Sequence, residues 1–429
     1  MPKKSAASAT HTEVAVRLSS RGVARLQARH PWVYRSDIVE AKDVVPGATV
    51  RVLDSQGKFL GTALYSSSSQ IAIRMISHGS VADLPALVAE RIRAAIAYRK
   101  RLVRNTDAYR IVFSEADFLP GLIVDRYNDV VTLQILTQAM DAAPVREAVL
   151  QTLCEELQPA GIVERVDARI RGLEQLPPLS SRLLWGEKSS TVINMNGRHM
   201  NGGNMNGATT NGGMTSGEES AAIRFHYDGL EGQKTGAFLD QRENYAAAAE
   251  YAHGEALDAF CYQGGFALHL ALHPAAKCSS VTGVDSSRPA LEMAEKNAAL
   301  NGRELEWIEG NAFDLLREYA AANRRYDTIV LDPPAFAKTK RDLEKALGGY
   351  KELNLRALKM LRPGGILVTC SCSFHVGASD FLGVVADAAQ DAHKSLRVIE
   401  NRGAAKDHPI LLNVPETSYL KCLILSVSN

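Results

Sequence analysis

The sequence predicts an α/β protein in which a doubly wound, mostly parallel sheet follows a small β-barrel and a small α+β unit. The main observation is a strict alternation of strand-like and helix-like segments from about residue 221 onward, which is typical of doubly wound folds. The second is a series of short β-like runs separated by turn signals over residues 13–80. The third is the length of 429 residues, which is too great for one compact core.

The composition is that of an ordinary folded chain and argues against several classes of protein. Hydrophobic residues make up 46% and charged residues 23%, and the apolar runs fall short of the roughly 18 residues of a membrane-spanning helix. The basic, polar N-terminus lacks the apolar segment of a secretory signal. Six cysteines, two of them in Cys370-Ser-Cys372, do not have the pattern of a disulfide framework. We therefore expect no membrane association and a cytoplasmic location.

The first unit, residues 13–82, is predicted to be a small β-barrel that binds a polyanion. Residues 1–110 contain 18 Lys and Arg against 8 Asp and Glu, whereas the whole chain has a net charge of only +1. The rest of the chain is therefore acidic. This asymmetry favours a nucleic-acid-binding module, and an ordinary solvated basic surface is the alternative.

The second unit, residues 83–190, is predicted to be a connector helix followed by a small α+β domain. Its helix, in LPALVAERIRAAIAYRKRLV, has apolar residues at helical spacing and a basic opposite face, which we expect to point to solvent or nucleic acid. The basic residues are Arg91, Arg93, Arg99, Lys100 and Arg101. Two strands joined at residues 127–129 and a helix over 142–156 are predicted to follow.

The next residues, 191–217, are predicted to be a disordered insertion, because they are rich in Asn, Gly and Met and have no apolar period. His199 and the nearby methionines could form a metal-binding tract, but the composition favours a linker, and we expect no metal in this protein. The last unit, residues 218–429, is the predicted doubly wound domain. Its strands are expected in EALDAF, SSVTGVD, LEWIEG, YDTIVLD, GGILVTCS and YLKCLILS.

The first strand of this last unit leads into a glycine turn and a helix, in ALDAFCYQGGFALHLAL. Asp258 ends the strand, and Gly264 and Gly265 allow a ligand to approach the backbone closely. The next strand ends at Asp285, where a carboxylate can accept hydrogen bonds from both hydroxyls of a ribose. The dinucleotide motif GxGxxG is missing here, so these residues favour a nucleoside without a pyrophosphate, S-adenosylmethionine.

The third and fourth strands also end in polar residues at the same edge of the sheet. After the third strand, Asn311 or Asp314 could accept a hydrogen bond from the amino group of adenine, although Asn311 could equally be a helix cap. The fourth strand is followed by Asp332, Pro333 and Pro334. The two prolines make a rigid turn that cannot continue the strand, and this turn is predicted to hold Asp332 at the ligand-binding edge.

The fifth strand ends in Thr-Cys-Ser-Cys-Ser and offers two candidate nucleophiles, Cys370 and Cys372. A thiolate that adds to C6 of a pyrimidine makes C5 nucleophilic enough to accept a methyl group, after which a base removes the C5 proton and the thiolate leaves. Strand alternation places both cysteines on one face, so only their depth distinguishes them. They could instead be buried apolar residues or half of a metal site, although no second cysteine pair has ligand spacing.

The segment 232–242, GQKTGAFLDQR, precedes the first strand of the doubly wound domain. It contains Gly, Lys and Thr but lacks the spacing of a P-loop and follows no buried strand, so we reject phosphate binding. Its small residues and its Asp-Gln-Arg end suit a strap laid over the cofactor.

Together these motifs resemble the large-subunit ribosomal RNA cytosine-C5 methyltransferases that carry an N-terminal PUA domain. The resemblance covers residues from about 13 to 429, and its most specific parts are GQKTGAFLDQREN, DAFCYQGGF, LDPPAFAK and TCSCS. It implies a PUA domain, a small α+β domain and a Rossmann-like class I methyltransferase domain that binds S-adenosylmethionine. The residues implied to hold this cofactor are Phe238, Asp240, Gln241, Arg242, Asp258, Gly264, Gly265, Asp285, Asn311, Ala312, Asp332 and Pro333.

The resemblance further implies transfer of a methyl group to C5 of a cytosine in 23S ribosomal RNA. The base would be flipped out of its stack into a pocket above the two prolines. The catalytic residues so implied are Cys372, which matches the family's nucleophile best, Asp332, which would hydrogen-bond the cytosine edge, and the neighbouring Cys370. The residues expected to contact the base are Pro334, Phe336 and Lys338.

The chain departs from the family pattern near the predicted site. Asn311 stands where members tend to have an acid, and Ala335 stands where related enzymes often have a second cysteine. Two other functions remain open: a methyltransferase that acts on a purine nitrogen, because Asp-Pro-Pro-aromatic turns also occur in amino-directed enzymes, and a non-catalytic RNA-binding protein. The target nucleotide and the oligomeric state, a homodimer included, also remain open.

Overall fold

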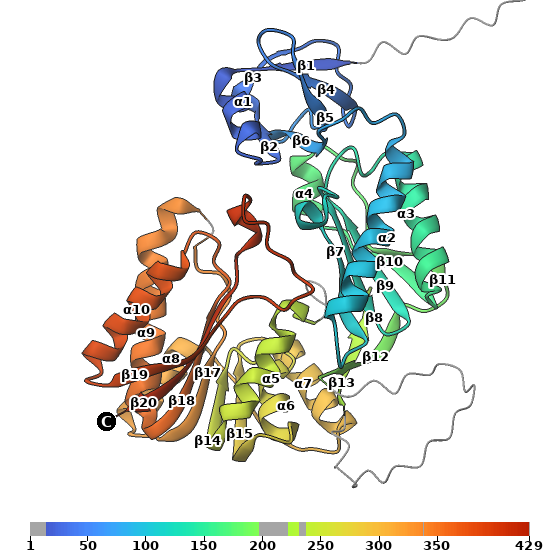
Figure 1. Cartoon of the computed structure of the whole chain (residues 1–429). Helices are drawn as coiled ribbons and strands as arrows, with labels where there is room; N and C mark the ends of the chain where they lie inside the picture. Colours follow the sequence, from blue (N-terminus) through green and yellow to red (C-terminus); the bar gives the residue numbers. More distant parts are fainter. Residues whose placement is uncertain (1–13, 197–221, 231–236, 338, 429) are drawn as a thin grey trace, which may run out of the picture.

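The computed structural model describes residues 14–196, 222–230, 237–337 and 339–428, and within these residues the chain forms three successive units (Figure 1). The first is a six-stranded sheet in the order β2-β6-β5-β4-β1-β3. Buried and exposed residues alternate along its strands, as in β4, where Val50 and Val52 face the core and Arg51 faces outward. The elements are β1 (Ala15–Leu18), α1 (Ser20–Gln27), β2 (Trp32–Tyr34), β3 (Ile38–Ala41), β4 (Thr49–Leu53), β5 (Phe59–Tyr65) and β6 (Ile71–Ser77).

The second unit is a five-stranded sheet in the order β11-β10-β9-β8-β7, covered by two helices whose apolar residues share one core with the strands. The two strands and the helix predicted around residues 127 and 142–156 are confirmed as β8, β9 and α3. The elements are α2 (Leu84–Leu102), β7 (Ala108–Phe113), β8 (Leu122–Tyr127), β9 (Val130–Ile135), α3 (Ala143–Leu157), β10 (Gly161–Glu164), α4 (Ala168–Leu173) and β11 (Arg182–Gly186).

The basic face of α2 points to solvent only in part: Arg93, Lys100 and Arg101 are exposed, as predicted, but Arg99 is not. Arg99 is completely buried, and its Nη2 donates to Asp117 Oδ2 at 2.8 Å and to the backbone carbonyl of Asp407 at 2.8 Å. Arg93 forms an ion pair with Glu156 at 2.9 Å. Arg99 and Arg93 therefore join α2 to other parts of the protein, whereas Lys100 and Arg101 remain exposed.

A two-stranded antiparallel ribbon connects the second unit to the third. It consists of β12 (Ser190–Met195) and β13 (Ile223–Asp228), with Ser190 opposite Asp228 and Met195 opposite Ile223. The stretch predicted to be disordered from residue 191 therefore begins as a paired strand, because Ile193 and Met195 are buried in the core of the third unit. Residues 197–217 of that predicted insertion lie outside the described residues.

The third unit is a seven-stranded sheet in the order β16-β15-β14-β17-β18-β20-β19, in which β20 runs antiparallel to its neighbours. The chain proceeds outward from β14 first to one side and then, through β17, to the other, so ligands are expected at the carboxyl ends of β14 and β17. The strands are β14 (His253–Ala259), β15 (Lys277–Asp285), β16 (Glu306–Glu309), β17 (Tyr326–Leu331), β18 (Leu361–Ser371), β19 (Ser395–Arg402) and β20 (Lys421–Ser428).

Helices cover both faces of this sheet, and each face has its own apolar core (Figure 1). Helices cover the inner strands on both faces of the sheet. Residues of these strands are therefore buried in unbroken runs, as in the last four residues of β14. On one face lie α5 (Arg242–Tyr251), α6 (Gly265–Leu272) and α7 (Arg288–Leu300). On the other lie α8 (Ala312–Ala321), α9 (Leu343–Met360) and α10 (Ala378–Asp391). Short 3₁₀ turns are η1 (Arg35–Asp37), η2 (Ser114–Asp117), η3 (Leu239–Gln241), η4 (Lys340–Asp342) and η5 (Pro415–Thr417).

The long connection between β19 and β20 links the third unit to the other two. It rises toward the N-terminal sheet (Figure 1), where Glu416 Oε2 lies 3.4 Å from His30 Nε2 and the side-chain amide of Asn413 donates to the carbonyl of Arg29. At its base, Asp407 contacts Arg99 of α2. No helix in the described part of the chain is both long and apolar enough to cross a membrane.

Candidate active site

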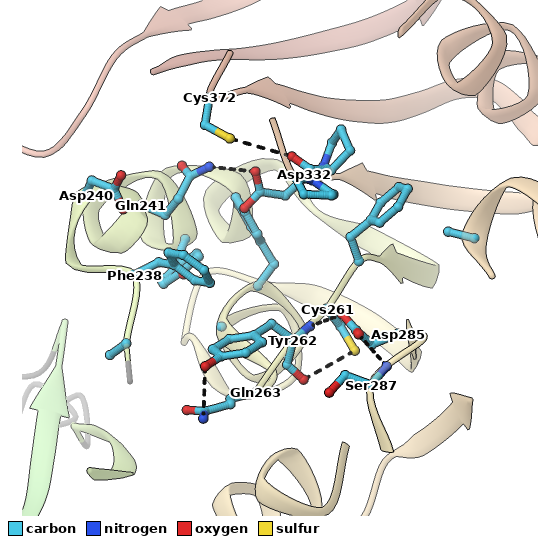
Figure 2. Close-up of a pocket in the computed structure, with 18 of the residues that line it drawn as sticks. Phe238, Asp240, Gln241, Cys261, Tyr262, Gln263, Asp285, Ser287, Asp332 and Cys372 are labelled. Carbon is cyan, nitrogen blue, oxygen red and sulfur yellow. Dashed lines mark hydrogen bonds between the residues drawn. The ribbon is translucent and has the colours of Figure 1, made fainter. Parts of the chain in front are cut away.

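A cavity of about 590 Å³ opens at the carboxyl ends of β14, β15 and β17 (Figure 2). Its walls come from the segments that follow these strands and the neighbouring β16 and β18, from the strap before α5, from the β12–β13 ribbon, and from the residues before β20. Its charged lining residues are Asp240, Asp285 and Asp332, and the described part of the wall includes no Lys, Arg or His. A wall of this charge favours a ligand that carries positive charge.

Asp285 stands at one end of the cavity and is held by the backbone. Its Oδ2 accepts from the amide of Tyr262 and its Oδ1 from the amide of Ser287, both at 2.9 Å. Gly265, at the start of α6, must be a glycine, because a Cβ atom there would lie 2.6 Å from the ring of Tyr245. The fixed carboxylate of Asp285 and the turn at Gly265, which has no side chain, together suit a ribose and its adjoining groups.

The strap is fixed to the turn after β17 through side-chain amides. Gln241 Nε2 donates to Asp332 Oδ1 at 2.9 Å, and Asn244 Nδ2 donates to Gln241 Oε1 at 2.7 Å. Tyr419, from the segment before β20, donates its hydroxyl hydrogen to Asp240 Oδ2 at 2.6 Å. Asp240 and Asp332 are therefore held on neighbouring parts of the wall, and Asp332 lies at the end opposite Asp285 (Figure 2).

The segment after the two prolines is anchored by Ser373. The Ser373 hydroxyl oxygen accepts from the amide of Phe336 at 2.9 Å and lies 2.9 Å from the hydroxyl of Tyr350. The Phe336 ring contacts the rings of Tyr350 and Phe313, with centroids 4.7 and 5.7 Å away. Pro334 and Phe336 thus form a rigid, partly aromatic wall at the Asp332 end.

The two candidate nucleophiles lie in different environments. Cys372 lines the cavity, with its Sγ 3.8 Å from the carbonyl of Pro333. Cys370 is completely buried inside β18, where it faces Cys422 of β20, and burial raises the pKa of its thiol well above the ordinary value. The structure therefore corrects the prediction that includes Cys370 in the site. Cys370 lies within β18 and belongs to the core, whereas Cys372, two residues later, lies just beyond the strand and lines the cavity.

Several other predicted residues are not brought to the cavity wall. Asp258 is completely buried and accepts from the amide of Ala267 in α6 at 2.9 Å, and burial raises the pKa of its carboxyl well above the usual range. Gly264 forms the turn itself, with φ 85°. Arg242 is buried against Asp407 at 2.9 Å. These three residues hold the backbone next to the cavity and do not line it. The fourth, Lys338, lies outside the described residues.

The remaining predicted residues are brought together around the cavity. The wall includes Phe238, Asp240, Gln241, Gly265, Asp285, Asn311, Ala312, Asp332, Pro333, Pro334, Phe336 and Cys372. Asn311 also caps α8 by accepting from the amide of Phe313 at 2.9 Å, so its two interpretations are compatible. Tyr419 and Leu420 also line the cavity but were not predicted, because the only local pattern near them in the sequence is the strand that follows. Among the described residues no group of His, Cys, Asp and Glu is arranged to hold a metal ion.

Comparison with known proteins identifies the family. A family model described as an S-adenosylmethionine-dependent methyltransferase matches residues 135–425, and one described as a PUA-like domain matches residues 16–78. The chain is 37% identical over 411 residues to the ribosomal RNA large subunit methyltransferase I of Shewanella denitrificans, covering 94% of this chain and 96% of that one. The corresponding protein of Alteromonas mediterranea is 34% identical over 412 residues, with the same coverage.

The chain belongs to the ribosomal RNA large subunit methyltransferase I family. Its methyl donor is S-adenosylmethionine, as predicted from the strand ends. The crystal structure of SMU.776 complexed with SAH superposes on this methyltransferase with a TM-score of 0.78 at 18% identity, covering 96% of this chain and all of that one. A second structure, from Streptococcus mutans, gives a TM-score of 0.76 at 17% identity. At such identities the likeness concerns the fold alone, and it confirms the predicted PUA-like and Rossmann-like class I architecture.

Proposed function

We propose that this methyltransferase transfers a methyl group to C5 of a cytosine in large-subunit ribosomal RNA through a covalent adduct of Cys372. The relatives that match along nearly the whole chain are named ribosomal RNA large subunit methyltransferases, which supports this RNA as the substrate. The PUA-like domain and the basic N-terminal quarter support RNA as the partner, because such a surface attracts phosphates.

The observation that carries the proposal is the position of Cys372 in the wall of the acidic cavity, beside the turn that holds Asp332. A second cysteine, Cys261, also lines the cavity, but its thiol lies toward Asp285, and burial raises its pKa well above the ordinary value. Cys372 is therefore the thiol best placed to reach a base that enters beside Pro334 and Phe336.

The cavity fits S-adenosylmethionine on two counts. The three carboxylates match the positive charge of a sulfonium and an ammonium group. Asp285, held in place by two backbone amides, matches the two hydroxyls of a ribose. When bound, S-adenosylmethionine supplies an electrophilic methyl group at its sulfonium sulfur.

The residues of the chain supply the rest of the chemistry. The Cys372 thiolate forms a bond to C6, and the electron pair of the C5=C6 bond moves into the ring. Asp332 enters this step protonated and donates its proton to N3, so that the ring can take up that electron pair. Once C5 carries the methyl group, a base removes the C5 proton, the double bond forms again, and the C6–S bond breaks to return the thiolate.

Release of the C5 hydrogen tests the proposal directly. The enzyme is incubated with S-adenosylmethionine and with 23S ribosomal RNA that carries tritium at C5 of cytidine, isolated from cells that lack this protein. We expect one tritium to reach water for each methyl group transferred, and bisulfite mapping should place the methyl group on a cytosine. Methylation of a purine nitrogen without tritium release would contradict the cytosine assignment, and no methylation of any RNA would favour a binding protein.

Replacing Asp285 by alanine tests the cofactor assignment. We expect the dissociation constant for S-adenosylmethionine to rise by about 10- to 100-fold, because charged hydrogen bonds to two hydroxyls are lost. Titration calorimetry on the full chain gives this constant. Asp314→Ala is the matched control, because Asp314 lies outside the cavity wall in an exposed pair with Arg317. Equal affinities of the Asp285 variant and the control would contradict the assignment.

A further inference from the structure

Lys421 is a buried basic residue on β20, next to the end of β18 that Cys372 follows. It is the first residue of β20 and lies opposite Ser371 of β18. Its side chain is 7% exposed, and its Nζ donates to the carbonyls of Ser373 at 2.7 Å and Tyr419 at 2.8 Å. Two backbone carbonyls therefore fix the ammonium group at the segment that follows Cys372.

The described groups of the cavity wall do not favour a thiolate at Cys372. The cavity wall carries the three carboxylates of Asp240, Asp285 and Asp332, and the carbonyl of Pro333 accepts from the thiol at 3.8 Å, which favours the neutral form. An apolar or negatively charged environment makes a thiol less acidic. A thiolate at this position requires a compensating positive charge.

Among the described residues, the titratable side chains of Tyr350 in α9, Tyr419 in the β19–β20 connection and Lys421 interact electrostatically with Cys372. Burial raises the pKa of both tyrosines, so both are neutral near pH 7. Burial lowers the pKa of Lys421 to about 8, while the attraction of Cys372 opposes this shift. Of these three groups, Lys421 is the one that can carry a positive charge at neutral pH.

We propose that Lys421 is a positioning residue that holds Cys372 in its thiolate form. The inference deepens the proposed function and rests on Cys372 as its nucleophile. When the thiol ionises, its S–H bond breaks, the electron pair stays on sulfur, and the proton passes to water in the cavity. The Lys421 ammonium group stabilises the resulting negative charge on Cys372 and, through its hydrogen bond to the Ser373 carbonyl, holds the segment that follows this cysteine.

The test is the pH profile with which iodoacetamide alkylates Cys372 in the full-length protein, without RNA or methyl donor. Peptide mass spectrometry with fragmentation separates Cys372 from Cys370. Because a nearby opposite charge favours the ionised form of a thiol, Lys421→Met should raise the midpoint of the profile by about one pH unit or more. Lys421→Arg, which keeps the charge, should give a smaller shift. Cys154 of α3 serves as the internal reference, and its profile should not change between variants.

The wild-type protein provides a test that needs no substitution. The midpoint for its Cys372 should lie below the value of about 8.5 of an ordinary thiol. A midpoint at or above that value, or an unchanged midpoint in a folded Lys421→Met variant, would overturn the inference.

Failure of this inference can be distinguished from failure of the proposed function. If Cys372→Ala abolishes methyl transfer while Lys421→Met leaves the alkylation profile unchanged, the nucleophile stands and the role of Lys421 is wrong. If the alkylation midpoint rises in Lys421→Met but Cys372→Ala remains active, the ion pair stands and the covalent mechanism is wrong.

Discussion

Replacing Cys372 by alanine is expected to lower the rate of methyl transfer by on the order of 10³-fold or more, because the adduct to C6 can no longer form. Without that adduct, C5 of cytosine is too weak a nucleophile to take the methyl group. Affinity for S-adenosylmethionine should stay the same, because Cys372 lies at the opposite end of the cavity from Asp285 (Figure 2). Single-turnover methylation of ribosomal RNA and titration calorimetry measure the two quantities separately.

Cys370→Ala is the matched control, since the two cysteines are two residues apart and only Cys372 reaches the cavity. Cys370 is buried opposite Cys422 in the core, so its loss should change stability slightly and the chemical step hardly at all. Full activity of Cys372→Ala combined with loss of activity in Cys370→Ala would reverse the assignment.

Three of the predicted residues that line the cavity share one property: they lie at or just after the ends of parallel strands. Asp285 ends β15, Asn311 follows β16 and Asp332 follows β17, and the carboxyl ends of parallel strands meet at one edge of the sheet. Chain order alone therefore brings them together. Tyr419 and Lys421 were not predicted because they lie at or just before the start of a strand and not at its carboxyl end. They reach the same edge because β20 runs antiparallel, and strand direction in a mixed sheet cannot be derived from a local pattern.

The charged residues were predicted least well, because their partners are distant in sequence. Arg99 and Arg242 look like surface or ligand-binding residues in their local patterns, but both are buried. Arg99 contacts Asp117 and the backbone of Asp407, which lies 308 positions away. The periodicity of apolar residues predicts which face of a helix is buried. It does not predict that a basic residue of the helix will be buried against a partner from another part of the chain.

The largest expected effect on stability is that of Asp407→Ala. Asp407 is completely buried, its Oδ1 accepts from Arg242 Nη2 at 2.9 Å, and its Oδ2 accepts from the amide of Arg110 at 2.8 Å. Removing the carboxylate leaves a buried guanidinium and a buried amide without these acceptors. We expect the free energy of unfolding to fall by about 3–5 kcal/mol, as when one partner of a buried ion pair is removed. Urea unfolding followed by circular dichroism measures this difference.

The pH dependence of this effect has a definite sign. Burial alone would raise the pKa of Asp407, but His408, Arg242 and the amide of Arg110 together hold the pKa of this carboxyl well below its usual range. A carboxyl whose pKa is lower in the folded than in the unfolded state stabilises the fold above the unfolded value of about 3.9, and this contribution disappears as pH falls toward the folded value. The difference in unfolding free energy between wild type and Asp407→Ala should therefore be constant near neutral pH and shrink below about pH 4.

Asp314→Ala provides the comparison for this variant, because it removes a carboxylate from an exposed pair with Arg317. Such a pair contributes about 0–1 kcal/mol, so its loss should hardly change the unfolding free energy. If Asp407→Ala costs no more than this control, the buried contacts among α2, α5 and the β19–β20 connection do not stabilise the protein. A large cost that persists unchanged below pH 4 would instead mean that packing, and not the charge of Asp407, holds these elements together.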